Sequence, residues 1–251
     1  MTAIKNLQNY LLPWLDVCAI ASWGILMLRY WHTGKLSLLI HRDYFWLVIA
    51  GGISLSVVSS LKALDLLQKR TNIPDVRHIT LFPPGFSSAL LLSTAILGLV
   101  ITPRAFASQT ALQRGVTEAL QATRSQPQAF RASIRPDERS LIDWVRTLNV
   151  YPEPDAYSGQ KVKVQGFVIN PPELPPEYLL LSRFVITCCA ADAYPVGLLV
   201  KLPSNNQVYA QDSWLEVEGE MITQDLQNKR QLTIRASSLK PIPEPQNPYE
   251  Y

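Results

Sequence analysis

The sequence has few of the residues and none of the motifs on which common enzymes depend. Its 251 residues include only three histidines and three cysteines. It contains no phosphate-binding P-loop, no dinucleotide-binding glycine motif, no G-x-S-x-G serine motif and no H-E-x-x-H zinc motif. The acids Glu216, Glu218 and Glu220 alternate with apolar residues, as on a solvated strand face, rather than forming an acid/base pair. We therefore expect that the chain is not an enzyme.

The lack of a basic cluster and the position of the histidines limit the kinds of partner and ligand that we expect. The net charge is only +3, and no cluster of Lys and Arg is present, so no nucleic acid is expected as a partner. The histidines His32, His41 and His78 all lie in the first third of the chain. A metal site in the remainder would therefore need sulfur and oxygen ligands. An odd, low cysteine count with an adjacent pair does not describe a disulfide framework.

Charge is also missing from most of the first hundred residues. Apolar stretches run over 11–31, 44–61 and 81–102, and the last two contain no charged residue. A bilayer core about 30 Å thick needs about 20 apolar helical residues, so region 1–103 is expected to be a bundle of three spans. The alternative is core helices of a soluble protein, in which uncharged runs of this length are rare. The lipid bilayer is thus an expected partner, and the cell membrane the expected location.

The orientation in the membrane is not decided by the basic residues. Five Lys or Arg near the span ends would lie on each side: Lys5, Lys62, Lys69, Arg70 and Arg77 against Arg29, Lys35, Arg42, Arg104 and Arg114. Three spans put the two termini on opposite sides. Our preference for a cytoplasmic N-terminus would place the C-terminal domain outside the cytoplasm.

Small residues recur at helical spacing in the second and third stretches. They are Gly52, Ser56 and Ser60, and then Thr94 and Gly98. Faces of small residues let helix backbones approach closely in lipid. They are candidates for docking on another membrane protein, or for packing among the three helices themselves, and the two uses are compatible.

The rest of the chain divides by composition. Residues 104–154 are polar with short helical patterns and form a linker, either along the membrane surface or packed on the next domain. Residues 155–240 contain five short runs of strand character, which predict an all-β domain, a small five-stranded barrel of the oligonucleotide/oligosaccharide-binding (OB) type. Gly166 and Gly219 stand where barrel strands must bend. The Pro-rich tail 241–251 is expected to be disordered.

The run from Arg183 to Ala193 contains the most unusual combination of reactive side chains in the sequence, with two adjacent cysteines, an arginine and an aspartate. If it is a strand, alternate residues face opposite sides, which places Cys188 in the core and Cys189 on the polar face with Arg183 and Thr187. A nearby Arg lowers the pKa of a thiol, so Cys189 is the better candidate for a reactive or ligating sulfur. Adjacent cysteines on a strand point apart, which disfavours a simple chelate.

Three interpretations of this run stay open. The cysteines could be structural, with Arg183 pairing with Asp192 across a turn. They could contact a metal or metalloid, with Asp192 supplying an oxygen to Cys188 and Cys189. They could also be redox-active. A metal ion is the one cofactor considered.

Several segments together resemble a known family. They are the N-terminal spans, Tyr157–Lys161 leading to Gly166–Val168, the run Arg183–Ala193, Pro195–Leu198 and Asp212–Gly219. They resemble uncharacterised bacterial membrane proteins described as subunits of a two-component permease. The resemblance implies a larger polytopic permease subunit as partner, one that exports a metal, metalloid or similar small solute.

We therefore weigh three functions. The first is an accessory subunit of a membrane transport complex, whose β domain binds or regulates. The second is a membrane-anchored binding protein that depends on a metal or on the thiols of Cys188 and Cys189. The third is a membrane-tethered OB-type module for a ligand such as an oligosaccharide.

Overall fold

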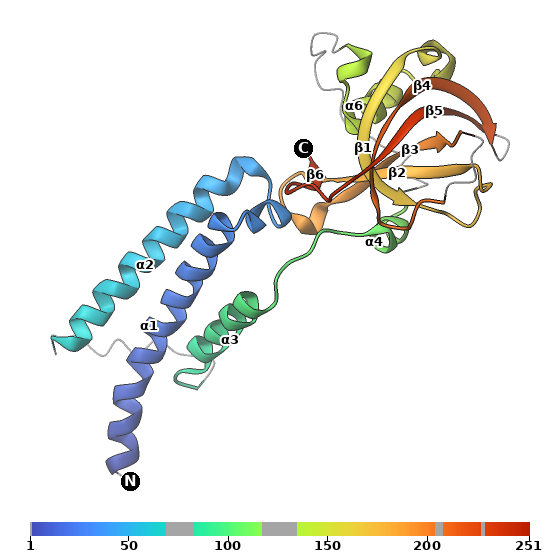
Figure 1. Cartoon of the computed structure of the whole chain (residues 1–251). Helices are drawn as coiled ribbons and strands as arrows, with labels where there is room; N and C mark the ends of the chain where they lie inside the picture. Colours follow the sequence, from blue (N-terminus) through green and yellow to red (C-terminus); the bar gives the residue numbers. More distant parts are fainter. Residues whose placement is uncertain (1, 69–82, 117–134, 204–207, 227–228) are drawn as a thin grey trace. The chain divides into compact units, whose positions relative to one another are not determined.

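The computed structural model describes residues 2–68, 83–116, 135–203, 208–226 and 229–251, with side chains from residue 11 onward. The chain divides into two compact units, Met1–Arg104 and Ala105–Tyr251 (Figure 1). Each unit has its own contacts and is treated separately below.

The first unit is helical. Its helices are α1 (Thr2–His32), α2 (Phe45–Leu67) and α3 (Phe86–Val100), and the short 3-10 helices η1 (Lys35–Leu38) and η2 (Arg42–Tyr44) connect α1 to α2. Two segments, Leu11–His32 and Arg42–Leu67, are long and apolar enough to cross a membrane. A chain that crosses lipid must satisfy its backbone hydrogen bonds internally, which a helix does.

A third span over 81–102 is not confirmed. Helix α3 has 15 residues, which at about 1.5 Å each gives about 22 Å, less than the thickness of a bilayer core. It begins late because Pro83 and Pro84 precede Gly85, whose left-handed backbone (φ 83°) forms the cap. It ends at Val100, since Ile101 is extended. Residues 81–82 lie outside the described part of the chain.

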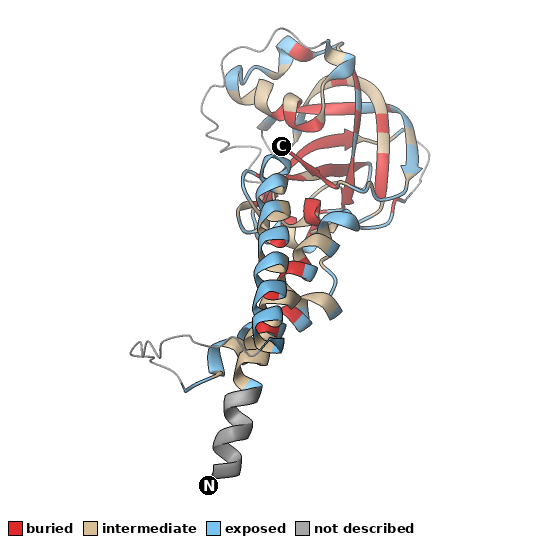
Figure 2. Ribbon diagram, turned by 90° about the vertical axis from the view of Figure 1, so that its left-hand side faces the viewer, coloured by how far each residue is buried: buried red, intermediate tan, exposed pale blue. Residues whose placement is uncertain are grey.

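Gly52 and Ser56 of α2 and Gly98 of α3 face α1. A Cβ added at Gly52 would lie 3.1 Å from the Leu28 side chain, and one at Gly98 would lie 2.9 Å from that of Leu26. A Cβ at Gly24 of α1 would in turn lie 2.7 Å from the Ser56 hydroxyl. These faces therefore serve the packing of the unit itself. Large apolar residues of α2 such as Val57 are exposed. Figure 2 shows that many positions on the helices of this unit are exposed.

Side chains of α1 also bond to backbone carbonyls of α3. The Trp23 indole N–H donates to the Leu91 carbonyl at 3.0 Å, and the Tyr30 hydroxyl donates to that of Gly98. The Ser88 hydroxyl donates to the Asp16 carboxylate. Because these bonds and close small-residue contacts act together, α3 is fixed to α1 despite its shortness.

The second unit is built on a sheet of six strands. They are β1 (Lys161–Ile169), β2 (Tyr178–Val185), β3 (Tyr194–Lys201), β4 (Trp214–Leu226), β5 (Lys229–Ile242) and β6 (Tyr249–Glu250). Its helices are α4 (Ser108–Gln113) and α6 (Leu141–Val150), with the 3-10 helices η3 (Pro136–Glu138), η4 (Pro154–Tyr157) and η5 (Ala190–Asp192). The expectation of five strands is corrected to six.

Each of the five longer strands pairs with two of the others, so the pairings lead from β1 through the sheet and back to β1. The sheet order is β1-β4-β5-β3-β2-β6, and β1 also pairs with β2. The β3–β5 and β2–β6 pairs are parallel, and the others are antiparallel. At the β4–β5 bend a Cβ on Gly219 would lie 2.2 Å from the Arg235 carbonyl oxygen, so only glycine fits there.

The core of this unit lies between the strands and α6. Trp144 and Leu141 of α6 are fully buried with apolar residues from all five longer strands, and Figure 2 shows many buried positions in the sheet. Helix α6 begins where Ser140 and Asp143 form a capping box, each side chain bonding to the other's backbone N–H.

The prediction of a disordered tail is wrong for the end of region 241–251. Strand β5 continues to Ile242, and Tyr249 and Glu250 form β6, with exposed fractions of 2% and 9%. Proline frequency suggested disorder, but the Tyr249 ring packs on Phe184 and Phe106, with ring centres 6.4 and 5.9 Å away. Burial of this aromatic side chain outweighs the composition of the tail.

The close approach of α2 to α1 can be tested with neighbouring glycines. Gly52→Leu is expected to destabilise the helical unit by about 1–3 kcal/mol, because the new side chain overpacks against Leu28. Gly51→Leu is the matched control, since its Cβ would come no closer than 3.9 Å to Met27. Thermal unfolding in detergent, followed by circular dichroism, compares the two. Equal melting temperatures would contradict this packing.

Candidate functional site

The run from Ile186 to Asp192 leaves the sheet as a turn. Strand β2 ends at Val185, and the Asp192 carboxylate then accepts hydrogen bonds from three successive backbone N–H groups: Thr187 at 3.3 Å, Cys188 at 2.8 Å and Cys189 at 3.2 Å. A local carboxylate thus replaces the strand ladder as partner of the backbone. The chain then continues through η5 into β3.

This turn corrects the predicted orientation of the cysteines. Cys188 is exposed rather than part of the core, and Cys189 is half-buried. The two sulfurs and a carboxylate oxygen of Asp192 all lie within 4.8 Å of one another. The expectation that the thiols point apart assumed a strand, and a turn removes that alternation. Cys188, Cys189 and Asp192 therefore form a group that could hold a metal ion, which we name the Cys-Cys-Asp turn.

The Asp192 carboxylate also sets the ionisation of this turn. The pKa of the Cys188 thiol is raised to about 11. Its hydrogen bond to Asp192 has the largest effect, and its hydrogen bond with Cys189 has the next largest. Desolvation acts to raise the pKa of Asp192, but hydrogen bonds from the Cys188 thiol and the three amides outweigh it and lower that pKa. The resting turn thus carries an ionised carboxylate and, at Cys188, a protonated thiol.

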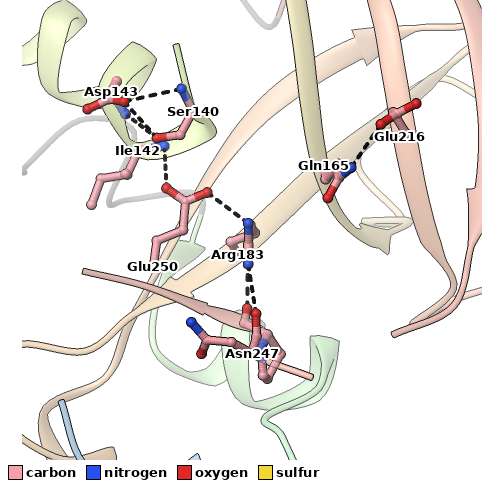
Figure 3. Close-up of polar contacts among 9 residues, drawn as sticks. Ser140, Ile142, Asp143, Gln165, Arg183, Glu216, Asn247 and Glu250 are labelled. Atoms are coloured by element: carbon pink, nitrogen blue, oxygen red, sulfur yellow. Dashed lines mark hydrogen bonds and ion pairs between the residues drawn. The ribbon is translucent and has the colours of Figure 1, made fainter. Parts of the chain in front are cut away.

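Arg183 does not serve this turn. Its guanidinium pairs with the Glu250 carboxylate at 3.1 Å and donates to the carbonyls of Asn247 at 3.1 Å and Pro248 at 3.4 Å (Figure 3). The predicted pairing of Arg183 with Asp192 is therefore wrong. Desolvation lowers the pKa of Arg183, and the neighbouring Glu250 charge opposes that shift.

Glu250 connects three elements of the unit. One carboxylate oxygen binds Arg183 of β2, and the other accepts the Ile142 N–H at 3.2 Å, in the first turn of α6 (Figure 3). Negative charge is favourable at a helix N-terminus, where the N–H groups have no intrahelical partner. The sequence analysis missed Glu250 because it lies in a Pro-rich segment without strand periodicity.

An open polar hollow of about 270 Å³ lies beside this ion pair. Its walls include Arg183, Glu250, Ser140 and, from β1 and β4, Lys163, Gln165 and Glu216. Lys163 pairs with Glu218 at 2.7 Å and Glu216 at 3.4 Å, and the Gln165 amide donates to Glu216 at 2.8 Å. Because these polar groups are satisfied by one another, the hollow does not demand a ligand.

The remaining predicted site residues are dispersed. Thr187 is exposed and contributes its backbone N–H to the Cys-Cys-Asp turn. Gly52, Ser56 and Gly98 pack against α1. Ser60 and Thr94 are exposed, and their hydroxyls donate to carbonyls four residues earlier, at 2.7 and 3.1 Å.

Two comparisons relate this chain to known proteins. Residues 114–251 match the model of the DUF1980 C-terminal domain. The chain is also 24% identical over 104 residues to the UPF0703 protein YcgQ of Bacillus subtilis (strain 168). That match covers 41% of this chain and 36% of YcgQ, so the chain spans about a third of the length of this curated relative.

The Arg183–Glu250 pair should carry much of the stability of the second unit. Glu250→Ala is expected to cost about 3–5 kcal/mol of unfolding free energy, because it leaves the mostly buried Arg183 charge unpaired. Glu218→Ala, which breaks an exposed pair with Lys163, should cost less than about 1 kcal/mol. Urea unfolding of the full chain, followed by tryptophan fluorescence, measures both. Similar losses in the two variants would contradict the assigned role.

The pKa of Cys188 predicts how its reactivity depends on pH. Only the thiolate is alkylated, so the rate at which iodoacetamide modifies Cys188 should increase with pH, with a midpoint near pH 11. Asp192→Asn removes the neighbouring charge and should move the midpoint to lower pH. Fragmentation mass spectrometry of the peptide that contains both cysteines measures alkylation of Cys188 while Cys189 stays in place. A midpoint unaffected by Asp192→Asn would show that the carboxylate does not control this thiol.

Proposed function

This chain belongs to the DUF1980 C-terminal domain family, and we propose that it is an accessory subunit of a membrane transport complex. In this proposal its apolar helices anchor it in the bilayer and contact a polytopic permease. The β unit is the binding or regulatory module in the adjacent aqueous phase.

The single observation that carries the proposal is the shortness of α3. Its length of about 22 Å falls short of the bilayer core, yet Leu90, Ile96 and Leu97 expose large apolar side chains. A short apolar helix in lipid is accommodated by bilayer thinning or by association with other helices. We propose that α3, with its flanking residues, completes a third span against a polytopic partner.

The docking face of this proposal differs from the small-residue face. Gly52, Ser56 and Gly98 are already used against α1, so they are not available to a partner. The large apolar residues on the outer sides of α2 and α3 remain, among them Val57, Leu61 and Leu97. The partner is therefore expected to contact these larger side chains.

The β unit fits the role of a binding module. Its pairings return from β2 to β1, which supports an OB-like barrel as the underlying architecture. On the outer side of β1 and β4, Lys163 pairs with Glu216 and Glu218, and Glu220 pairs with Arg235 of β5. The Cys-Cys-Asp turn supplies exposed donor atoms, which supports the alternative of a metal- or thiol-dependent binding protein as part of the same role.

Purification from the native membrane in a gentle detergent tests the proposal. The tagged full chain is expected to bring along one polytopic protein in stoichiometric amount, identified by mass spectrometry. A photo-reactive residue at Leu97 should crosslink to that protein, whereas the same residue at Lys161 on the β unit serves as a control site. A chain that purifies alone and yields no crosslink from Leu97 would contradict the proposal.

A further inference from the structure

We infer that the Cys-Cys-Asp turn binds a thiophilic metal ion, held by the thiolates of Cys188 and Cys189 and a carboxylate oxygen of Asp192. The three donor atoms lie within 4.8 Å of one another on a turn that is open to water. This inference rests on the proposed function and deepens it, because it names the class of ligand that the β unit takes up.

The spacing of the donors suits a small ion. Tetrahedral ligands at about 2.3 Å from a zinc ion lie about 3.8 Å apart. The donors here spread over at most 4.8 Å, so their separations need to shorten by about 1 Å to close the set. Both cysteines and Asp192 belong to one short segment of the chain, which keeps the three donors together.

The turn is held in place before any ion arrives. The hydrogen bonds of Thr187, Cys188 and Cys189 to Asp192 orient the carboxylate and fix the backbone of both cysteines. One carboxylate oxygen accepts two of these amide bonds and the other accepts one. The carboxylate also accepts a hydrogen bond from the Cys188 thiol, and loss of that thiol proton on metal binding frees this acceptor position for a cation. Such outer-shell bonds raise the affinity of a metal site because the ligand side chains are already oriented and lose less conformational freedom on binding.

The donor set determines the class of ion. Two thiolates select soft or borderline ions such as Zn²⁺, Cd²⁺ and Cu⁺ over Mg²⁺ and Ca²⁺, which prefer oxygen. For Zn²⁺ the binding step releases the two thiol protons to water, and the Asp192 carboxylate is already ionised.

The site is suited to exchange of its ion. The described residues contribute three donor atoms, so a tetrahedral ion keeps one position for water or for a ligand from another molecule. Cys188 is exposed, which gives an incoming ligand access to the ion. Within a transport complex, this open position is where a donor group of the permease would take up the ion or deliver it.

Metal titration of the full chain in detergent tests the inference. After reduction and removal of metal with a chelator, the wild type is expected to bind one Zn²⁺ or Cd²⁺ per chain by elemental analysis. Cadmium should produce the ultraviolet absorption of Cd–thiolate bonds. Cys188→Ser and Cys189→Ser should each weaken binding by more than about tenfold, since each removes a direct ligand. Cys18→Ser is the matched control and should bind as the wild type does.

The variants also separate loss of a ligand from loss of the fold. Cys188 is exposed, so its serine variant should keep the wild-type circular dichroism and melting temperature. Asp192→Asn keeps an oxygen acceptor for the amides but loses the charge, and should bind more weakly. A wild type that stays metal-free, or binding that persists in the double Cys188→Ser, Cys189→Ser variant, would overturn the inference.

The two proposals fail separately. Metal-free protein that still purifies with a polytopic partner would exclude the metal site and leave the subunit role standing. Stoichiometric, cysteine-dependent metal binding by a chain without any partner would leave the site standing and exclude the transport complex.

Discussion

The second unit depends on the bond between Arg183 and Glu250, which joins segments 67 residues apart in the chain. Through Glu250 the strand β6 contacts β2 and the first turn of α6, and through its backbone it receives the Ile186 N–H at 3.0 Å. That last bond is made where β2 ends, immediately before the Cys-Cys-Asp turn. The ion pair therefore fixes the point from which the candidate site departs from the sheet.

In the first unit the corresponding constraint is close backbone approach. Gly24, Gly52 and Gly98 let α2 and α3 approach α1 closely. Hydrogen bonds from Trp23 and Tyr30 to carbonyls of α3 fix the position of α3 along α1. These glycines therefore pack inside the unit and are not available to another protein. What remains for lipid or another protein are the larger apolar side chains on the outer surfaces.

The parts of the fold that follow a local period were predictable from the sequence. The sequences of β1 and β4 alternate apolar and polar residues, and long apolar stretches indicate α1 and α2. The start of β2 has no such alternation, because Leu179, Leu180 and Leu181 are all apolar and all buried. The cysteine orientations, the partner of Arg183 and strand β6 were missed because each depends on a residue outside the local pattern: Asp192, Glu250 and Phe184.

The raised pKa of Cys188 has a consequence for the chemical durability of the protein. Oxidation of cysteine proceeds through the thiolate, and a thiol with a pKa of about 11 is ionised in only about one molecule in ten thousand at pH 7. The exposed Cys188 thiol is thereby slow to react with peroxides or to form mixed disulfides. The same carboxylate that shapes the turn thus keeps Cys188 reduced in surroundings where exposed thiols are usually lost.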